Sequence, residues 1–313
     1  MSAQRTPDMN DEDRNISETA RTVNCNLCGA DDYKVVFPAG CAQLHRIVRC
    51  RRCGLMYANP LRRVDCEDYA VQPLEEYNPV SECNRQYYEK QVSQLPDNMQ
   101  VLDVLDGVFP RRGNLLEVGS FLGLFLDRIR ADGWQVTGLE PYRPGADYAR
   151  TKFGLDIIDG VLPNPSLPSA HFDAAVMLHV IEHMPDPAAN LRELRRVLKP
   201  GGVLVVETPR FDSLSFKLLG RRERSIRNCP GHIFFFTEQT LRQIMERNGF
   251  SVFRVDRVGR TLTMERFLFN IGLVTSCAPL QHWLVRAAKT LHLDKVCFYV
   301  NVRDMQRMYA RAV

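Results

Sequence analysis

The chain has 313 residues, of which 45% are hydrophobic and 25% are charged, a composition typical of a globular protein with a substantial core. Its formal net charge of only +4 speaks against a dedicated nucleic-acid binder, which usually carries a strong basic excess. The first twenty residues contain no apolar stretch, and no segment reaches about 18 uninterrupted apolar residues. We therefore expect neither an export signal nor a transmembrane segment, and the ten cysteines are predicted to be reduced thiols of a cytoplasmic protein.

Composition and pattern divide the chain into four parts. The N-terminal part is polar and mixed in charge, which predicts disorder, and paired cysteines follow it. A mostly helical linker or cap then precedes a long region of alternating strand and helix patterns, which contains two stretches that resemble lid insertions. The predicted parts are a disordered tail (1–20), a zinc knuckle (21–60), a helical linker or cap (61–112) and a cofactor-binding domain (113–313), with insertions near 209–231 and 261–296.

The paired cysteines form two CxxCG turns, Cys25 to Gly29 and Cys50 to Gly54, with 21 residues between Cys28 and Cys50. Each turn directs two thiolates toward one point, and two such turns make the tetrahedral sulfur cage that Zn²⁺ prefers. A closed four-cysteine site has no open position for a substrate, so we expect Cys25, Cys28, Cys50 and Cys53 to hold a structural zinc. Four unrelated buried cysteines, an iron–sulfur cluster and a redox role are the alternatives.

Seven short segments, several of them continuous apolar runs, predict strands, and helical patterns separate most of them. Asp186 followed by Pro187 predicts the start of one helix, and Thr237 caps another. Alternation of this kind predicts an α/β fold with a parallel, doubly wound sheet. The predicted strands are 115–118, 135–139, 155–158, 174–178, 203–207, 250–255 and 305–311.

A glycine-containing loop, Glu117-Val118-Gly119-Ser120-Phe121-Leu122-Gly123, joins the first predicted strand to a helix. Glycines let the backbone approach a ligand closely, and the amides of a helix start point at its polar groups. Glu140 ends the next strand 23 residues after Glu117, where a carboxylate can accept hydrogen bonds from both ribose hydroxyls of an adenosine. These features also suit a dinucleotide dehydrogenase, but the GxGxxG order is absent.

The ordered set of motifs resembles the class I S-adenosylmethionine-dependent methyltransferases over roughly residues 113–260. This resemblance implies a Rossmann-like, seven-stranded sheet and S-adenosylmethionine as cofactor. The motifs that carry it are Leu116-Glu117-Val118-Gly119, Gly138-Leu139-Glu140-Pro141, Phe172-Asp173-Ala174, the segment from His179 to Pro187, Leu198-Lys199-Pro200-Gly201-Gly202, the segment from Gly231 to Thr237, and Asn248-Gly249-Phe250.

The resemblance also implies roles for individual residues. The loop would meet the methionine part of the cofactor, the second motif its ribose, and the end of the third strand its adenine. One departure is that Phe121 stands where the family usually has a second glycine, so the loop must accommodate this ring. The implied cofactor-binding residues are Glu117, Gly119, Ser120, Phe121, Gly123, Glu140, Pro141, Asp159, Gly160, Val161, Leu178 and His179.

Three histidines are candidates for the base that removes a proton from the methyl acceptor. We expect His232 either to face the substrate or to hold its loop by hydrogen bonds, His179 to lie beside the cofactor, and His183 to act mainly in fixing a turn. His179, Glu182 and His183 would share one face of a helix, so a divalent ion at this point is an open alternative that also resembles some quinone O-methyltransferases.

Two CxxC turns ahead of such a domain resemble bacterial methyltransferases of sugar, quinone and natural-product biosynthesis. We therefore expect methyl transfer to an oxygen or carbon of a small molecule and not to a nucleic acid, with the oligomeric state open. An RNA methyltransferase with a zinc knuckle is one alternative, although an Asn-Pro-Pro-Tyr type turn is absent. A non-catalytic, zinc-bearing interaction protein is the other.

Overall fold

The computed structural model describes residues 20–39, 46–62, 82–223, 226, 231–265, 267–268, 278–293 and 296–313. The predicted tail lies almost wholly outside these ranges, as do 63–81 of the predicted linker and parts of both predicted insertions. None of the helices within the described ranges is long and apolar enough to cross a membrane.

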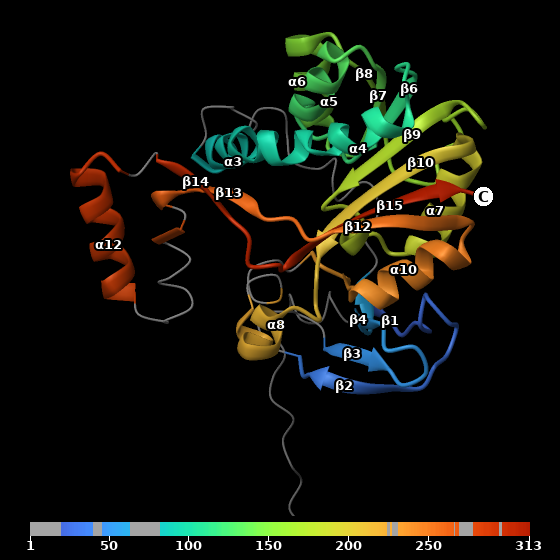
Figure 1. Cartoon of the computed structure of the whole chain (residues 1–313). Helices are drawn as coiled ribbons and strands as arrows, with labels where there is room; N and C mark the ends of the chain where they lie inside the picture. Colours follow the sequence, from blue (N-terminus) through green and yellow to red (C-terminus); the bar gives the residue numbers. More distant parts are fainter. Residues whose placement is uncertain are drawn as a thin grey trace, which may run out of the picture.

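A central sheet of seven strands confirms the predicted Rossmann-like arrangement (Figure 1). Its order is β12-β15-β10-β9-β6-β7-β8, so the chain starts in the middle, fills one half and then returns to fill the other. The strands are β6 (Asn114–Val118), β7 (Gln135–Glu140), β8 (Asp156–Asp159), β9 (Phe172–Leu178), β10 (Leu198–Pro209), β12 (Phe250–Asp256) and β15 (Met305–Ala312).

The sheet is not wholly parallel, which corrects one expectation. Strand β15 pairs antiparallel with both β10 and β12, while the other neighbouring pairs are parallel. The reason is the connection: the segment between β12 and β15 leaves and returns at the same edge of the sheet, so the two strands pair antiparallel without a crossover.

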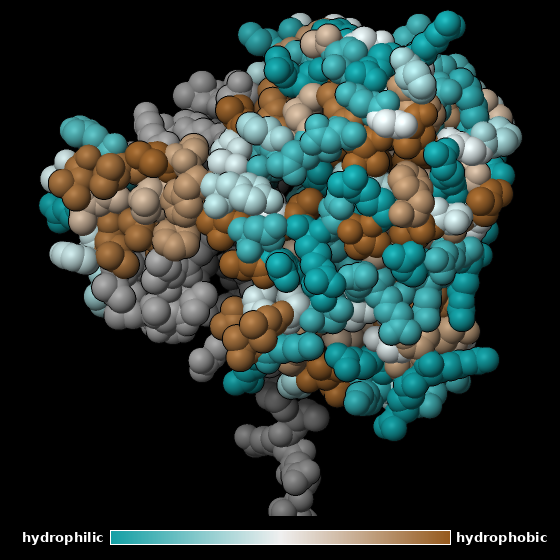
Figure 2. Space-filling view, viewed as in Figure 1, coloured by the Kyte–Doolittle hydropathy of each residue, from teal (hydrophilic) through white to brown (hydrophobic). Residues whose placement is uncertain are grey.

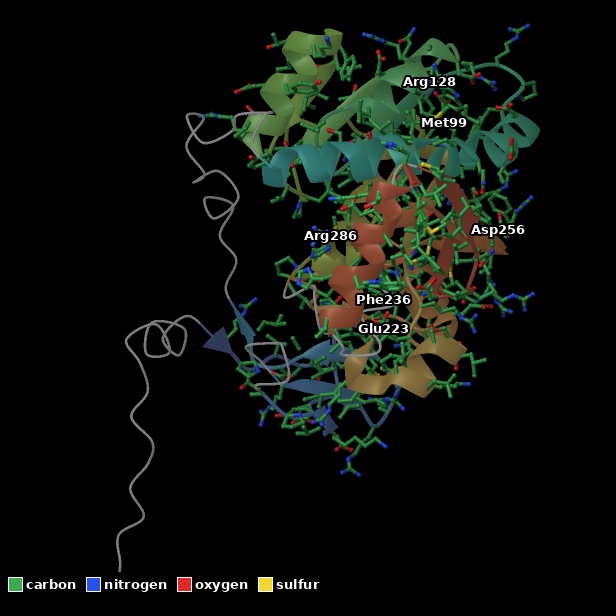
Figure 3. The ribbon with its side chains drawn as sticks, turned by 90° about the vertical axis from the view of Figure 1, so that its left-hand side faces the viewer. Met99, Arg128, Glu223, Phe236, Asp256 and Arg286 are labelled. Atoms are coloured by element: carbon green, nitrogen blue, oxygen red, sulfur yellow. The ribbon has the colours of Figure 1, made fainter. Side chains whose placement is uncertain are left out.

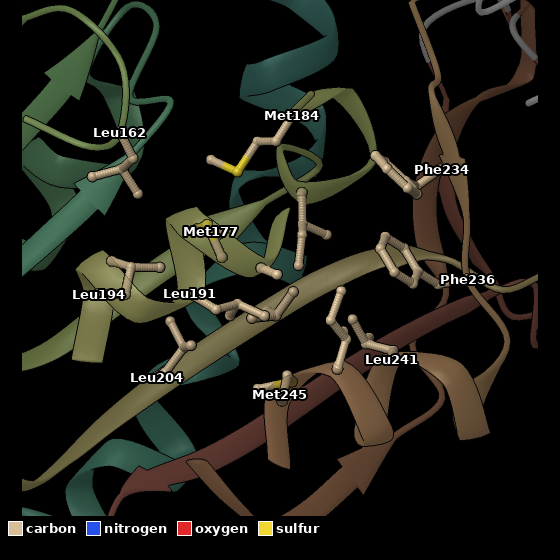
Figure 4. Close-up of a cluster of buried hydrophobic side chains, with 14 of the residues drawn as sticks. Leu162, Met177, Met184, Leu191, Leu194, Leu204, Phe234, Phe236, Leu241 and Met245 are labelled. Carbon is tan, nitrogen blue, oxygen red and sulfur yellow. The ribbon is translucent and has the colours of Figure 1, made fainter. Parts of the chain in front are cut away.

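Side chains that alternate along the strands fill a core on each face of the sheet. In β9, Ala174 and Val176 face one cluster, whereas Ala175 and Met177 face the other. The first face is covered by α4 (Val101–Val108), α5 (Leu124–Ala131) and α6 (Arg143–Phe153). The second face is covered by α7 (Pro187–Val197) and α10 (Glu238–Arg247), whose leucines meet Met177 and Leu204 in one buried cluster (Figure 4).

The predicted helix starts are present. The side chain of Asp186 accepts a hydrogen bond from the amide of Ala189 with Pro187 in the first turn, and Thr237 caps α10 through the amide of Thr240. These caps fix where α7 and α10 begin, and therefore where the loops before them meet the edge of the sheet.

The N-terminal part forms its own small sheet, to which the larger domain contributes a strand. Its order is β11-β4-β3-β2, and β11 (Phe234–Phe235) comes from the segment just before α10. The other strands are β2 (Tyr33–Phe37), β3 (Ile47–Cys50) and β4 (Met56–Ala58), with a further pair of β1 (Ala20–Arg21) and β5 (Leu61–Arg62).

Additional helices and a ribbon surround this frame. Helix α3 (Glu82–Met99) precedes α4, and α8 (Leu214–Leu219) with the 3₁₀ turn η2 (Gly220–Arg222) follows β10. An arm leaves the sheet between β12 and β15: β13 (Arg260–Thr263) and β14 (Cys297–Val300) pair antiparallel, and α12 (Ala278–Thr290) lies beyond them (Figure 1). Asp97 of α3 anchors the arm by accepting hydrogen bonds from the amide and hydroxyl of Thr261.

Candidate functional site

A cavity of about 790 Å³ opens at the carboxyl ends of β6, β7 and β9. This edge is where ligands bind in open α/β sheets, at the point where the strand order reverses. The loops after the three strands, the starts of η1 (Ile181–His183) and α7, and one side of α3 form its wall. Helix α3 contributes Gln91, Gln94, Leu95 and Asn98, which the sequence motifs did not indicate.

The loop after β6 is held tightly against its neighbours. Gly119 has a φ of +79°, and a Cβ there would lie 2.5 Å from Cγ2 of Val180, so only glycine fits without a shift. Phe121 also has a positive φ, +46°, and its ring stacks on Tyr142 with 5.7 Å between the ring centroids. The aromatic ring that replaces the family's second glycine is therefore accommodated by a partner ring, and both residues line the cavity.

Glu140 is fixed at the end of β7 by two backbone amides. Its Oε2 accepts a hydrogen bond from the amide of Phe121 at 2.7 Å, and its Oε1 accepts one from Tyr142 at 2.8 Å. Burial raises the pKa of Glu140, although these two amides oppose the shift. Each carboxylate oxygen retains acceptor capacity, so the side chain is oriented and still able to bind hydroxyl groups in the cavity.

Two further polar groups face the same cavity. Glu117 is buried, and burial together with the charge of Glu140 raises its pKa well above the usual range. Among the described residues, neither Oε2 of Glu117 nor Oγ of Ser120 has a hydrogen-bond partner. Buried polar atoms of this kind are usually satisfied by a ligand or water.

Two of the predicted cofactor residues do not line the cavity. Gly123 caps α5 with a φ of +73°, and a Cβ there would lie 2.8 Å from the Cβ of Ala149, so this glycine serves helix packing. Asp159 instead pairs with Arg150 at 2.7 Å. The other residues named from the sequence do line it: Glu117, Gly119, Ser120, Phe121, Glu140, Pro141, Gly160, Val161, Leu178 and His179.

His179 lies between two buried carboxylates. Its Nε2 is 3.3 Å from Oε1 of Glu207 and its Nδ1 is 3.8 Å from Oε1 of Glu182. Burial lowers the pKa of His179, but the two carboxylates outweigh it and the net pKa is raised. Glu207 also accepts a hydrogen bond from Nε of Arg307 at 2.6 Å, a partner 100 residues away that no local pattern indicates.

Glu182 is fully buried at the centre of the histidines. Burial raises its pKa, but the neighbouring His179, 3.8 Å away, and the positive charges of protonated His183 and His232 outweigh burial and bring the pKa to about 2. The hydroxyl of Thr208 donates to its Oε2 at 2.9 Å. The site therefore holds a buried carboxylate anion.

His183, and not His232, is the histidine of this pair that faces the cavity. His183 lines the cavity, whereas His232 is buried behind it with 4.7 Å between the ring centroids. The segment 181–183 is a 3₁₀ turn preceded by His179 at a φ of +60°, so His179 does not share a helical face with His183. Instead Glu182, His183 and His232 bring ligand atoms within 4.8 Å of one another.

The four knuckle cysteines converge as predicted. Their Sγ atoms all lie within 4.8 Å of one another, with 3.4 Å between those of Cys25 and Cys53 and 3.5 Å between those of Cys28 and Cys50. Zn–S bonds of about 2.3 Å in a tetrahedron place sulfurs about 3.8 Å apart, so the cluster is close to the size that zinc needs. The amides of Gly29 and Gly54 close the two turns onto the carbonyls of their first cysteines.

Residues 88–255 match the family model described as a methyltransferase domain. This segment is more than half of the chain, and the chain belongs to this family. The seven-stranded order and the cavity at the carboxyl edge agree with that membership.

Relatives agree with the family. A protein of Mycolicibacterium smegmatis, named as a probable S-adenosylmethionine-dependent methyltransferase, is 32% identical over 140 residues, covering 44% of this chain and 52% of its own. A ubiquinone biosynthesis O-methyltransferase of Yersinia pestis is 29% identical over 114 residues, covering 34% of this chain and 46% of its own. The chain thus spans about half the length of the curated relatives it matches.

A solved structure shares the fold. It is a methyltransferase from Thermotoga maritima described as a possible histamine N-methyltransferase, with a TM-score of 0.50 and 19% sequence identity. The match covers 73% of this chain and 94% of the other.

Proposed function

We propose that this chain binds S-adenosylmethionine in the cavity at the carboxyl edge of the sheet and transfers its methyl group to a small molecule. The observation that carries the proposal is the oriented carboxylate of Glu140, which faces the cavity together with the unpartnered oxygen of Glu117 and the hydroxyl of Ser120. Bound S-adenosylmethionine supplies an electrophilic methyl group on a positively charged sulfur. Glu140 would accept hydrogen bonds from the ribose, and Phe121 and Tyr142 would border the cofactor from one side.

We assign the role of base to His183. The short distance of 2.9 Å from its Nδ1 to the carbonyl oxygen of Gly231 favours a proton on Nδ1, which leaves Nε2 free to accept a proton. A hydroxyl or acidic carbon of the acceptor would lose its proton to Nε2 as the carbon–sulfur bond breaks and the new methyl bond forms. His232 would position His183 from behind, and His179, with its raised pKa, would add positive charge beside the cavity.

A divalent ion held by Glu182, His183 and His232 is the second reading of the same cluster. In that case Nδ1 of His183 would still donate to Gly231, an arrangement common among metal-binding histidines. The two readings differ in metal content. If Glu182→Gln and His232→Ala each lose a bound metal while the knuckle zinc is retained, the result would favour the ion over the base.

The cysteine cluster fits a structural zinc, which we propose for Cys25, Cys28, Cys50 and Cys53. A small-molecule acceptor, a cytoplasmic location and the domain division given above are part of the proposal. The modest net charge and the printed name of the Yersinia pestis relative support the small-molecule acceptor.

The test measures S-adenosylhomocysteine release from S-adenosylmethionine with phenolic, quinol, sugar and RNA substrates. We expect turnover with at least one small molecule, and His183→Gln should lower kcat by about 10²–10⁴-fold. His171→Gln changes an exposed histidine outside the cavity and should leave turnover unchanged. Turnover with RNA alone would support the RNA methyltransferase, and no cofactor binding would support the non-catalytic alternative.

A further inference from the structure

Two insertions outside the central sheet carry an unusual share of exposed apolar side chains. They are the segment 210–231, which contains α8, and the arm 260–300, which contains α12. Together they are about a fifth of the chain, yet they hold seven of the twelve large hydrophobic side chains found exposed among the described residues. These seven are Leu214, Leu218, Trp283, Leu291, Leu293, Val296 and Tyr299.

The same two insertions concentrate positive charge. By sequence they contain 11 of the 41 lysines and arginines but only 4 of the 37 aspartates and glutamates. The remainder of the chain has 30 basic and 33 acidic residues, so its net charge is negative. By sequence, the net positive charge of the protein therefore lies in these two segments. Among their described cations, Arg210, Arg260 and Lys289 form ion pairs, and Lys217 and Arg286 lie on α8 and α12.

The two helices lie on one flank of the molecule. In Figure 1, α12 is at the far left and α8 at the lower left of the sheet, and Figure 2 shows brown side chains gathered at both places. Figure 3 looks onto this flank, with α12 nearest the viewer and Arg286 labelled on it. Trp283 is 65% exposed, and Leu214 and Leu218 are 69% and 76% exposed.

We propose that this flank docks onto the surface of an anionic lipid bilayer. Helices with exposed Trp and Leu beside Lys and Arg lie in the headgroup region, where the apolar groups enter the acyl boundary and the cations meet lipid phosphates. Tryptophan in particular favours the membrane–water interface. Neither α8 nor α12 contains an acidic residue that would oppose an anionic surface.

Charge separates this occupant from a second copy of the chain. A symmetric dimer through the flank would bring two net-positive surfaces together, which is unfavourable. RNA would satisfy the cations, but the exposed leucines of α8 offer nothing to phosphates or sugars. An anionic bilayer matches both the charge and the apolar groups.

The experiment mixes the full chain with vesicles of phosphatidylcholine, with and without about one-third phosphatidylglycerol. We expect co-sedimentation only with the anionic vesicles, reduced by salt, and a blue shift of tryptophan emission. Trp283 reports this shift because the other tryptophan, Trp134, is buried. Replacing Leu218 and Trp283 by Ser should weaken vesicle binding about tenfold or more, whereas Val35→Ser, at a site 50% exposed on β2, should not.

A second pair of variants tests the charge. Arg286→Gln on α12 should weaken binding and its salt dependence, while Arg128→Gln, exposed on α5, should not. Failure to bind anionic vesicles would overturn the proposal. A chain that does not bind vesicles but forms a dimer, which Trp283→Ser dissociates, would also overturn it. So would a chain that does not bind vesicles but binds RNA with an affinity that the apolar substitutions leave unchanged.

Discussion

Four buried glutamates show how the surroundings of a carboxyl group decide its charge. Glu117 and Glu140 lie close to each other without a cationic partner in the described part of the chain, and the pKa of each is raised. Glu182 and Glu207 are also buried, but histidines and Arg307 bring the pKa of each to about 2. The cavity thus has one wall that favours neutral or hydrogen-bonding groups and another that holds fixed charge.

The raised pKa of Glu117 makes the cofactor-free protein sensitive to alkaline pH. A carboxyl whose pKa is higher when folded contributes most stability below its unfolded pKa, near 4.5, and that contribution is lost as pH rises through the folded value. Glu117→Gln should remove this loss. At pH 8 it should unfold at a higher urea concentration than wild type, with a free energy of unfolding larger by about 1–3 kcal/mol. Identical pH dependence of the two proteins would contradict a raised pKa of the buried Glu117 carboxyl.

His179 is a base whose pKa is also raised, and its contribution to stability can be tested by titration. Its pKa is raised by Glu182 and Glu207, so the stability it contributes is present below about pH 6.5 and is lost as pH rises through the raised value. Glu207→Gln should lower the pKa of His179, so that its ring protons titrate at a lower pH when followed by NMR. Glu246→Gln, on the exposed side of α10, is the control, and an unchanged His179 titration in Glu207→Gln would refute the assignment.

Local patterns predicted some of this residue-level picture and missed the rest. Glu117, Glu140 and the glycine loop follow from motifs within 24 residues, and the structure brings them to one cavity. The relative positions of His183 and His232 could not be predicted, because they depend on how segments 48 residues apart meet. Arg307 reaches Glu207 only through the pairing of β10 with β15.

At the scale of elements, the knuckle and the larger domain share a sheet. Strand β11 pairs with β4, and the amide of Ala58 donates to the carbonyl of Ile233, the residue after His232. The amide of Ile233 in turn donates to the carbonyl of Glu182. The knuckle therefore supports the loop that holds His232 against His183.

Loss of a metal from the knuckle should loosen the loop that carries His232. In Cys28→Ser we expect zinc, measured by mass spectrometry, to be lost and the amides of 231–235 to exchange faster with solvent. Structural zinc contributes roughly 10 kcal/mol or more to the folding of such small modules, so the loosened sheet no longer anchors β11. Cys297→Ser lies outside the cluster and serves as the control. Unchanged exchange at 231–235 after zinc loss would show that the knuckle does not support the site.

The elements themselves were largely readable from the sequence. All seven predicted strands are present within a few residues, because most of them are short, largely apolar segments with clear breaks. The antiparallel direction of β15 and the recruitment of β11 into the small sheet were not predicted. Both depend on pairing between distant segments, which a periodic pattern does not encode.

At the scale of the whole molecule, three modules meet around one cavity. The sheet supplies the strand ends, the knuckle supports the histidine loop, and α3 closes one side while tying the arm to the sheet through Asp97. Arg307 also donates to the carbonyl of Asp97, so the arm, α3 and the buried charge cluster are linked. This connection predicts that cofactor binding stabilises α3 and the sheet together.

Calorimetry with the purified chain tests most directly whether Glu140 binds the ribose of S-adenosylmethionine. The wild-type protein should bind the cofactor, and Glu140→Ala should weaken binding by at least about tenfold, because hydrogen bonds to a charged group contribute about 1.5–3 kcal/mol. Glu246→Ala should bind as wild type does. Equal affinity of wild type and Glu140→Ala, or no binding by wild type, would contradict this role of Glu140.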